Sequence, residues 1–293
     1  MQAVVRNRVE NPGFDSPKSE RSMAERVRWA AWSCSHSPLT DEGSFREFLR
    51  VLREWKPDRL VCLGDLLDGS PASKHPNEDV WSLEEEFRHA AGVLNRAAEA
   101  CGPSLRMKVW LHGNHDENVL SPNRLPPRLR SLLDWRNTRT PLAEAVLGPS
   151  GRGDGTPDGG WREIPYSHRQ IYRIGQAVFQ HGAETSGQAG RNLAQLYAPE
   201  YGILVFGHTH RPAPPTEAML NPKISLKRWW ANAGCLVDWN RLEYARRMNI
   251  TEWGHACVVG WSEVGEKRVN FHSRRWHAET ILLKKCGSGH SHG

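Results

Sequence analysis

Apolar residues along the chain fall into short unbroken runs that alternate with segments of helical spacing. A run of about four to eight apolar residues between polar turns predicts a buried strand, and apolar residues that repeat about every 3.6 positions predict an amphipathic helix. The predicted strands are Val27–Ser33, Leu60–Leu63, Met107–Leu111, two strands within Ile171–Gln180, Gly202–Phe206, Trp229–Ala231, Ala256–Trp261 and Arg268–Phe271. The predicted helices are Ser44–Trp55, Trp81–Ala100 and Asn192–Tyr197.

The order of these elements predicts an α/β fold. Strands and helices alternate in the first half of the chain, and from Ile224 onward the chain consists mostly of short strands. A strand–helix half followed by a strand-rich half indicates layers of helix and sheet, with two sheets packed against each other.

Three segments depart from this alternation. Residues 1–25 are polar and rich in turn-forming residues, so we expect a disordered arm, and we expect residues 276–293 to form a flexible tail. Residues 26–275 between them would form one domain. Residues 121–167 carry several prolines and a glycine-rich run, which predicts a long loop inserted into this domain. The loop contains two candidate short helices, Leu125–Leu133 and Leu142–Leu147.

The composition narrows the class of protein. The 39 lysines and arginines exceed the 33 aspartates and glutamates by 6, and arginine can pair with phosphate through two parallel hydrogen bonds. None of the six cysteines forms a Cys-x-x-Cys pair, which excludes a zinc knuckle and favours a reducing, cytoplasmic setting. No apolar run reaches about 18 residues, so no membrane-spanning helix is predicted. The charged N-terminus does not resemble a secretory signal.

Residues with metal-binding side chains directly follow several of the predicted strands. Aspartate, asparagine and histidine at strand ends gather oxygen and nitrogen donors on one rim of a sheet. Such an arrangement suits two divalent metal ions that share a carboxylate. The blocks are Cys34-Ser35-His36, Gly64-Asp65-Leu66-Leu67-Asp68, Gly113-Asn114-His115-Asp116, His181-Gly182 and Gly207-His208-Thr209-His210.

These blocks, in this order, resemble the signature of calcineurin-like metallophosphoesterases. The family pattern is Asp-x-His, Gly-Asp-x-x-Asp, Gly-Asn-His-Asp/Glu, a lone His and Gly-His-x-His. The resemblance extends over roughly Val27–Phe271, leaves residues 121–167 outside, and implies a four-layer αββα sandwich. Two further segments, Trp161–Tyr166 and Trp230–Gly260, resemble metallophosphoesterases of phages and prophages, which implies a place in DNA or RNA metabolism.

The resemblance implies two metal sites that share one carboxylate. Asp65 would bridge the two ions, because its two oxygens can span a separation of about 3.5–4 Å. Neutral imidazoles and an asparagine carbonyl would add donors without excess negative charge, which keeps the ions Lewis acidic. The first site would consist of Cys34, His36, Asp65 and His210, and the second of Asp65, Asn114, His181 and His208.

Position 34 departs from the family pattern, since this chain has Cys34 where the family has aspartate. If Cys34 is a thiolate ligand, its soft sulfur favours Fe²⁺ or Zn²⁺, with Mn²⁺ as an alternative. A metal-bound thiol loses its proton and can therefore replace the charge of the aspartate. Alternatively, the ligand is lost and the first site is weak or empty. The lariat-debranching enzymes, which are RNA phosphodiesterases of the same family, also have Cys-x-His in this block.

The resemblance also implies residues that act on the substrate. His115 would protonate or stabilise the leaving oxygen. Asp116 would orient His115 or, alternatively, cap the start of a helix. Asp68 is expected to support the site rather than to bind metal. The candidate phosphate-binding residues are Arg211, for which a plain surface position is the alternative, and Arg128 and Arg130 in the arginine-rich loop.

Three functions fit these residues. The first is a dinuclear-metal phosphodiesterase that hydrolyses nucleic acid or a nucleotide with a metal-activated hydroxide. The second is a phosphomonoesterase acting on a phosphoprotein or a small metabolite, since the same centre performs both reactions. The third is a non-catalytic binding scaffold, because family members that lose metal ligands can lose activity. The retained His115 favours an enzyme, and the pattern gives no oligomeric state.

Overall fold

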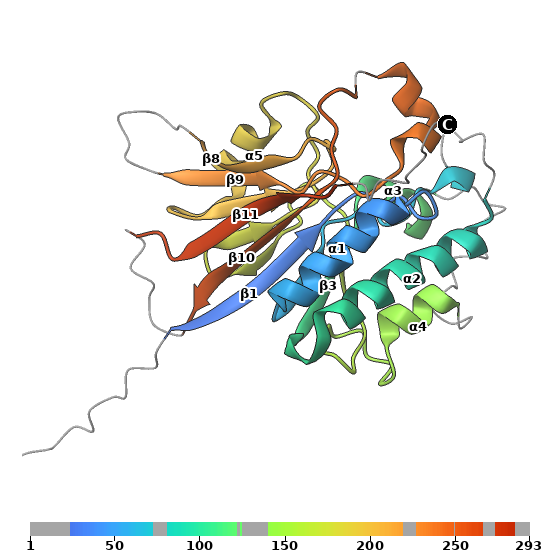
Figure 1. The fold of residues 1–293 in the computed structure, drawn as a ribbon, viewed down its shortest axis with the longest axis horizontal. Helices are drawn as coiled ribbons and strands as arrows, with labels where there is room; N and C mark the ends of the chain where they lie inside the picture. Colours follow the sequence, from blue (N-terminus) through green and yellow to red (C-terminus); the bar gives the residue numbers. More distant parts are fainter. Residues whose placement is uncertain are drawn as a thin grey trace, which may run out of the picture.

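The chain folds into two β-sheets with helices on their outer faces. The computed structural model describes residues 24–72, 81–121, 124, 140–218, 227–248, 250–265 and 273–284, which Figure 1 draws in colour. In spatial order, the first sheet consists of β11 (Trp276–Leu282), β10 (Ala256–Val264), β1 (Glu25–Trp32), β2 (Arg59–Cys62), β3 (Met107–Leu111) and β4 (Arg162–Ile164). The second consists of β5 (Tyr172–Ile174), β6 (Ala177–Phe179), β7 (Ile203–Phe206), β9 (Arg228–Asn232) and β8 (Ala213–Ala218).

The strands that carry the predicted metal-binding blocks run parallel within their sheets. In the first sheet β1, β2, β3 and β4 are parallel, and in the second β6, β7 and β9 are parallel. The remaining strands, β5, β8, β10 and β11, pair antiparallel with their neighbours. The carboxyl ends of parallel strands share one edge of a sheet, where ligands of open α/β sheets bind.

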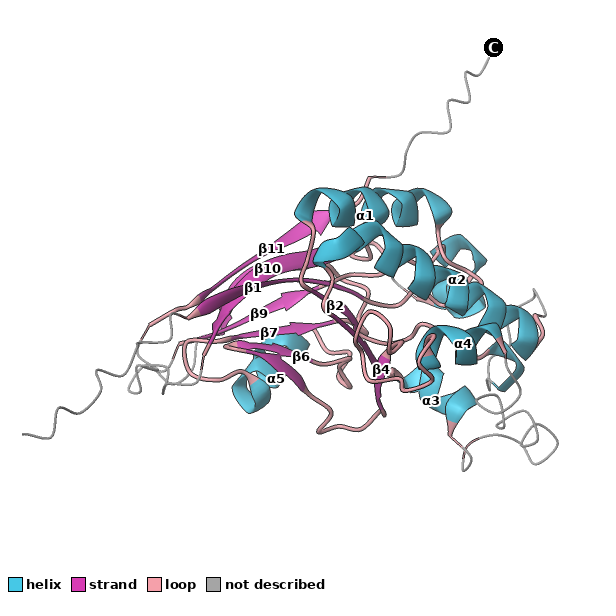
Figure 2. Cartoon of the chain, turned by 90° about the horizontal axis from the view of Figure 1, so that it is seen from below, coloured by secondary structure: helices cyan, strands magenta, loops and turns pink. Residues whose placement is uncertain are grey.

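Helices cover both outer faces, and the molecule therefore has four layers (Figure 2). Residues of α1 (Glu42–Trp55), α2 (Leu83–Cys101) and α4 (Pro141–Leu147) share one apolar core with the first sheet, and α5 (Ala189–Tyr197) shares another with the second. A third core lies between the sheets. Alternate residues of β1 serve two cores, because side chains of a strand point to opposite faces. Ala30 and Trp32 face the helices, and Trp29 and Ala31 face the second sheet.

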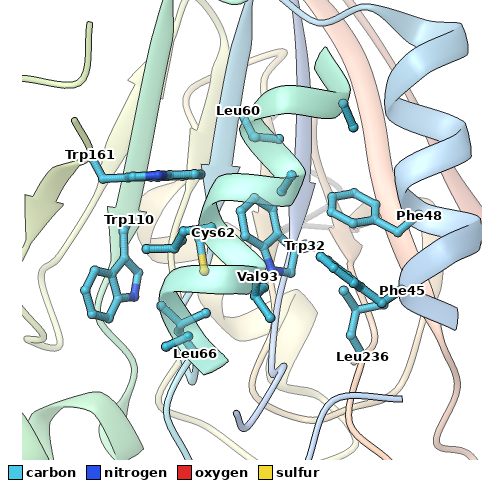
Figure 3. Packing of buried hydrophobic residues seen from close by; sticks show 14 of the residues in the cluster. Trp32, Phe45, Phe48, Leu60, Cys62, Leu66, Val93, Trp110, Trp161 and Leu236 are labelled. Carbon is cyan, nitrogen blue, oxygen red and sulfur yellow. The ribbon is translucent and has the colours of Figure 1, made fainter. Parts of the chain in front are cut away.

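Aromatic side chains hold the helices to the first sheet. The ring of Trp32 lies 5.3 Å from that of Phe48 in α1 and 5.8 Å from that of Trp161, which precedes β4 (Figure 3). The helices α1 and α2 each start at a residue whose side chain caps the helix. The side chain of Asp41 accepts a hydrogen bond from the amide of Ser44 at the start of α1, and Ser82 begins α2 with a capping box.

The predicted fold class, an αββα sandwich, is confirmed. The predicted strands and helices within the described residues are present, with boundaries shifted by a few residues, and Leu142–Leu147 forms α4. The predicted strand Arg268–Phe271, the predicted helix Leu125–Leu133 and residues 1–23 lie outside the described residues. Among the described helices, each is too short or too polar to span a lipid bilayer.

Two expectations about the ends of segments were wrong. The flexible tail was expected to begin at residue 276, but Trp276–Leu282 forms β11 at the edge of the first sheet. Its side chains alternate between buried and exposed at the start, which is typical of a strand with one covered face. The second half of the expected insertion, residues 121–167, is also part of the sandwich. There α4 packs on α2, and β4 pairs with β3.

Candidate metal centre

The predicted metal-binding residues come together at the carboxyl edge of the parallel strands. Each of the seven candidate ligands lies in the segment that follows such a strand. They follow β1 (Cys34, His36), β2 (Asp65), β3 (Asn114), β6 (His181) and β7 (His208, His210). Ligand atoms lie within 4.8 Å of one another in Cys34, His36 and His210, and likewise in Asp65, His181 and His208.

The surroundings of His181 favour a positive charge at its Nε2, which either a proton or a metal ion supplies. Its Nδ1 lies 2.8 Å from the carbonyl oxygen of Leu63, and a carbonyl only accepts, so Nδ1 carries the hydrogen. The Nε2 of the neutral ring then presents a lone pair, 3.2 Å from Oδ2 of Asp65 and 3.1 Å from Oδ1 of Asn114. Three acceptors thus converge on one point. Burial lowers the pKa of His181, but the charge and hydrogen bond of Asp65, the charge of Asp116 and the hydrogen bond to Leu63 together raise it above its usual value, which favours a proton at this position when no metal is bound.

His36 is held in the orientation that a metal ligand needs. Its Nδ1 lies 3.2 Å from Oδ1 of Asp68, and its Nε2 lies 3.9 Å from Oδ2 of Asp65. A carboxylate that accepts from one ring nitrogen leaves the lone pair of the other nitrogen available for a metal ion. Asp68 therefore has the supporting position expected from the sequence.

Three buried imidazole nitrogens have no hydrogen-bond partner among the described residues. They are Nε2 of His36, Nδ1 of His208 and Nδ1 of His210. Burial, followed by neighbouring imidazoles, lowers the pKa of His208 to about 4 and that of His210 well below its usual range. Both rings are therefore neutral near pH 7, the form that binds metal. Buried nitrogens without partners are rare, and two divalent ions would account for all three.

Cys34 lies where a sulfur ligand can complete the first site. The residue is fully buried, and its Sγ lies 3.0 Å from Oγ of Ser33. Burial and then the charge of Asp65 raise the pKa of the thiol well above its usual value. The thiol is therefore neutral without a metal ion, and binding of an ion would remove its proton. The neighbouring donors, His36 and His210, fit the alternative in which Cys34 is a metal ligand. That Cys34 binds a metal ion stays a prediction.

At the centre, several non-glycine residues have positive φ angles, a backbone conformation that residues with a side chain rarely adopt. Left-handed φ angles at non-glycine residues cost about 1–3 kcal/mol each and cluster at functional sites. Among the described non-glycine residues, two positive φ angles lie elsewhere, at Lys56 and Tyr201. The others are those of Cys34 (53°), His36 (46°), Asp65 (50°), His208 (64°) and His210 (60°).

Two residues that bind no metal hold these loops in place. The amide of Asn232 donates to the carbonyl oxygen of Gly207 at 3.1 Å and to the hydroxyl of Thr209 at 3.0 Å. Gly113 lets its loop approach the centre closely, because a Cβ atom there would collide with Oδ1 of Asp65. The glycines of the metal-binding blocks thus serve close packing as well as turns.

The expected orientation of His115 by Asp116 is wrong. The carboxylate of Asp116 accepts hydrogen bonds from the amides of Leu67 and Gly113, both at 2.8 Å, and from Nε1 of Trp110 at 3.3 Å. It closes the start of α3 (Asn114–Leu120), so the alternative role at a helix start fits the geometry. His115 is oriented instead by the carbonyl oxygen of Asp68, 2.7 Å from its Nδ1. The reason is that Asp116 is the third residue of α3, where its carboxylate meets the amide of Gly113 at the helix start and the donors of Leu67 and Trp110 from neighbouring segments.

A cavity of about 710 Å³ opens over the candidate ligands. His115 and Arg211 line it, and Nε of Arg211 lies 3.1 Å from Oε2 of Glu252. Arg128 and Arg130 lie outside the described residues, so their position relative to the cavity stays a prediction. The sequence did not single out several lining residues as parts of the site, because they lie on loops and short helices without a strand-end signal. They are Asn118, Arg124, Thr185, Tyr244, Met248 and Trp253.

One protein-family model and several solved structures are similar to this chain. The family model described as calcineurin-like phosphoesterase matches residues 28–212. Solved structures with similarity include Yfce, a phosphoesterase from E. coli, with 12% identity, a TM-score of 0.38, and coverage of 88% of this chain and 100% of that one. They also include vacuolar protein sorting 29 from Cryptosporidium parvum, with 12% identity, a TM-score of 0.37, and coverage of 88% and 98%.

The nuclease MPE of Pseudomonas putida is similar with 15% identity, a TM-score of 0.33, and coverage of 72% of this chain and 74% of that one. No curated protein sequence gave a match. The family match spans more than half of the chain and contains the blocks from Cys34 to His210 that converge on the cavity. The chain therefore belongs to the calcineurin-like phosphoesterase family.

Proposed function

We propose that this protein is a dinuclear-metal phosphodiesterase that hydrolyses phosphodiester bonds in nucleic acid or a nucleotide. The observation that carries the proposal is the convergence of three acceptors, Asp65 Oδ2, Asn114 Oδ1 and His181 Nε2, beside a large cavity. Acceptors this close need a proton or a metal ion between them, and a divalent ion can bind all three at once. Seven candidate ligands suit two ions, and Cys34 favours Fe²⁺ or Zn²⁺ over Mn²⁺.

The residues around the cavity divide the work of hydrolysis. Two bound ions would lower the pKa of a shared water and neutralise the oxygens of the phosphate. His115 would supply a proton to the leaving oxygen. Burial lowers the pKa of His115, but the charges of Asp65, Asp68 and Asp116 and the hydrogen bond to the carbonyl oxygen of Asp68 together raise it above its usual value. This favours a proton at Nε2 while Nδ1 donates to that carbonyl oxygen. Arg211 would bind a phosphate oxygen, held in position by Glu252.

The size of the cavity favours a diester over a monoester. A phosphodiester carries an organic group on each side of the phosphorus, and a cavity of about 710 Å³ has room for both groups. The basic excess of the chain, 39 residues against 33 acidic ones, adds attraction for a polyanion. The five cysteines among the described residues are free and buried, which is compatible with the cytoplasmic setting that we propose.

Two assays test this proposal against its alternatives. Turnover of bis-p-nitrophenyl phosphate should exceed that of p-nitrophenyl phosphate, and the reverse order would favour a phosphomonoesterase. Absence of hydrolysis with Fe²⁺, Zn²⁺ and Mn²⁺ would favour a binding scaffold. If the partner is nucleic acid, the affinity for single-stranded DNA or RNA should fall steeply as the salt concentration rises. Each phosphate contact contributes about 0.7 to the slope of log affinity against log salt concentration. Replacing Arg128 and Arg130 by alanine should therefore reduce the magnitude of that slope by about one to two.

A further inference from the structure

The cavity has an apolar side that the chemistry of phosphate hydrolysis does not use. Tyr244, Met248 and Trp253 line it, and we refer to these three residues as the aromatic wall. Tyr244 belongs to the short helix η5 (Glu243–Arg247), and the other two follow it in the loop before β10. Met248 is 52% exposed, and it lines the cavity beside the two rings, so the three residues together give the cavity an apolar surface that suits an apolar ligand.

The aromatic wall lies directly beside the reacting groups. The ring of Trp253 is 4.3 Å from that of His210, a candidate ligand of the first ion. The ring of Tyr244 is 6.3 Å from that of His115, the candidate proton donor, and 6.2 Å from that of Trp253. A phosphate bound at the centre would therefore have the aromatic wall within reach of an organic group attached to it.

Polar and cationic side chains line other parts of the same cavity. They include Arg124, Arg211, Thr185 and Thr209. A bare phosphate or a small sugar phosphate would satisfy these groups and leave the aromatic wall exposed to water. A ligand that combines an anionic phosphate with a flat apolar ring would contact both parts, because bases stack on aromatic side chains whatever their sequence.

We propose that the aromatic wall is a binding subsite for the base of a nucleoside attached to the phosphate at the metal centre. This inference deepens the proposed function and rests on it, since the phosphate must bind at the same centre. It names the nucleoside phosphate as the class of ligand and assigns its recognition to Tyr244, Met248 and Trp253.

A matched pair of ligands isolates the base. Adenosine 5′-monophosphate and ribose 5-phosphate carry the same phosphate and sugar, and only the first has a base. Their affinities would be measured by titration calorimetry on the metal-loaded protein, which requires no turnover. Stacking on one aromatic ring contributes at least about 1 kcal/mol, which is a roughly fivefold difference in affinity. We expect adenosine monophosphate to bind at least about fivefold more tightly, and Trp253→Leu and Met248→Ser each to reduce that advantage.

The chain offers a matched control for Trp253. Trp239 packs against the same small apolar cluster as Trp253, and its ring stacks on that of His255 at 4.2 Å. Unlike Trp253, it does not line the cavity. Trp239→Leu should therefore keep the advantage of the base. The affinity of ribose 5-phosphate should stay unchanged in all three variants, which shows that the centre itself is intact.

Other outcomes separate this inference from the proposed function. Equal affinities of the two ligands in the wild type, or an advantage that survives in both cavity variants, would overturn the base subsite alone. Absence of binding by both ligands would overturn the proposed function and the subsite with it. Phosphotyrosine that binds more tightly than adenosine monophosphate, and loses that advantage in the same variants, would replace the nucleoside by a phosphoprotein.

Discussion

The Nδ1 atom of His115 lies 2.7 Å from the carbonyl oxygen of Asp68, and this contact determines the chemistry that His115 can perform. A carbonyl oxygen accepts hydrogen bonds only, so Nδ1 carries a hydrogen in either charge state of the ring. The exchangeable proton is therefore the one on Nε2. The same residue, Asp68, binds Nδ1 of His36 through its carboxylate, so one residue orients both a candidate metal ligand and the candidate proton donor.

Replacing His115 by asparagine should slow the reaction in a way that depends on the leaving group. Loss of a proton donor reduces the rate by about 10²–10⁴-fold when the leaving oxygen is basic. We expect a loss in this range of kcat for an alkyl or nucleoside leaving group, and a much smaller loss for p-nitrophenolate, which leaves without protonation.

Metal content is the control for this variant. A nitrogen of His115 also lies within 4.8 Å of ligand atoms of His36 and Asp65, so the geometry alone permits a metal contact. Unchanged metal content in His115→Asn would support a proton donor. Loss of about one ion per chain, with equal rate losses for both kinds of leaving group, would make His115 a ligand instead.

Asp116 should stabilise the fold without taking part in the reaction. In Asp116→Asn, one of the three donors around the buried carboxylate would face an amide nitrogen, and a buried donor without a partner costs about 1–3 kcal/mol. We expect chemical denaturation to detect a loss of this size, while kcat of the folded protein changes far less than the roughly 10²–10⁴-fold of a catalytic group. A large fall in kcat with unchanged stability would restore the catalytic role predicted from the sequence.

Glu86 should make the stability of the metal-free protein depend on pH. Its carboxylate accepts hydrogen bonds from the amides of Gly69 at 3.0 Å and Ser70 at 3.1 Å, directly after Asp68. Burial and then the charge of Asp68 raise the pKa of Glu86 from 4.5 to about 8, against the effect of the two amides. The folded state therefore binds more protons than the unfolded state between these values. The contribution of protonated Glu86 to the free energy of unfolding is therefore fully present below pH 4.5, and it is lost as the pH rises through about 8.

The comparison with Glu86→Gln isolates this group. Each unit of pKa shift corresponds to about 1.4 kcal/mol, so the free energy of unfolding should fall by several kcal/mol more in the wild type than in the variant between pH 5 and pH 8. Urea denaturation with a chelator present would measure both curves. Parallel curves would mean that Glu86 is ionised in the folded protein throughout this range.

Cys34→Asp should change the metal that the protein prefers. A thiolate favours Fe²⁺ or Zn²⁺, and a carboxylate accommodates Mn²⁺ better. We expect the purified wild type to contain iron or zinc, and the variant to show its highest activity on bis-p-nitrophenyl phosphate with Mn²⁺. Activity that appears only in the variant would mean that Cys34 disables the first site.

The sequence predicted the sandwich and the candidate ligands because both depend on apolar strands. Asp65 and His208 lie directly behind runs that are buried on both faces, and such runs are recognised without knowledge of the fold. The strands that were missed lack this signal. The strand β8 contains two prolines and lies at the edge of its sheet, where a missing amide hydrogen does no harm. The strand β4 has three residues, none of which is fully buried.

The contacts around the centre could not be predicted because they depend on tertiary arrangement. Whether Asp116 meets His115 or the amide of Leu67 depends on how α3 starts, and both partners are compatible with the same sequence block. Tyr244 and Trp253 reach the cavity from a segment near the end of the chain that has no regular apolar spacing. They pack in one small apolar cluster with Cys34 and Leu39, so their proximity to His115 and His210 depends on how loops far apart in the sequence pack together.

Metal stoichiometry measured together with activity shows whether the proposed centre holds two ions that depend on Asp65. Wild type and Asp65→Asn would be purified without chelators, analysed for Fe, Zn and Mn by mass spectrometry, and assayed on bis-p-nitrophenyl phosphate. We expect the wild type to contain about two ions per chain. We expect Asp65→Asn to keep its fold, to lose one or both ions, and to lose its activity. A wild type that holds one ion or none while hydrolysing the diester, or a variant that keeps two ions and full activity, would contradict a centre bridged by Asp65.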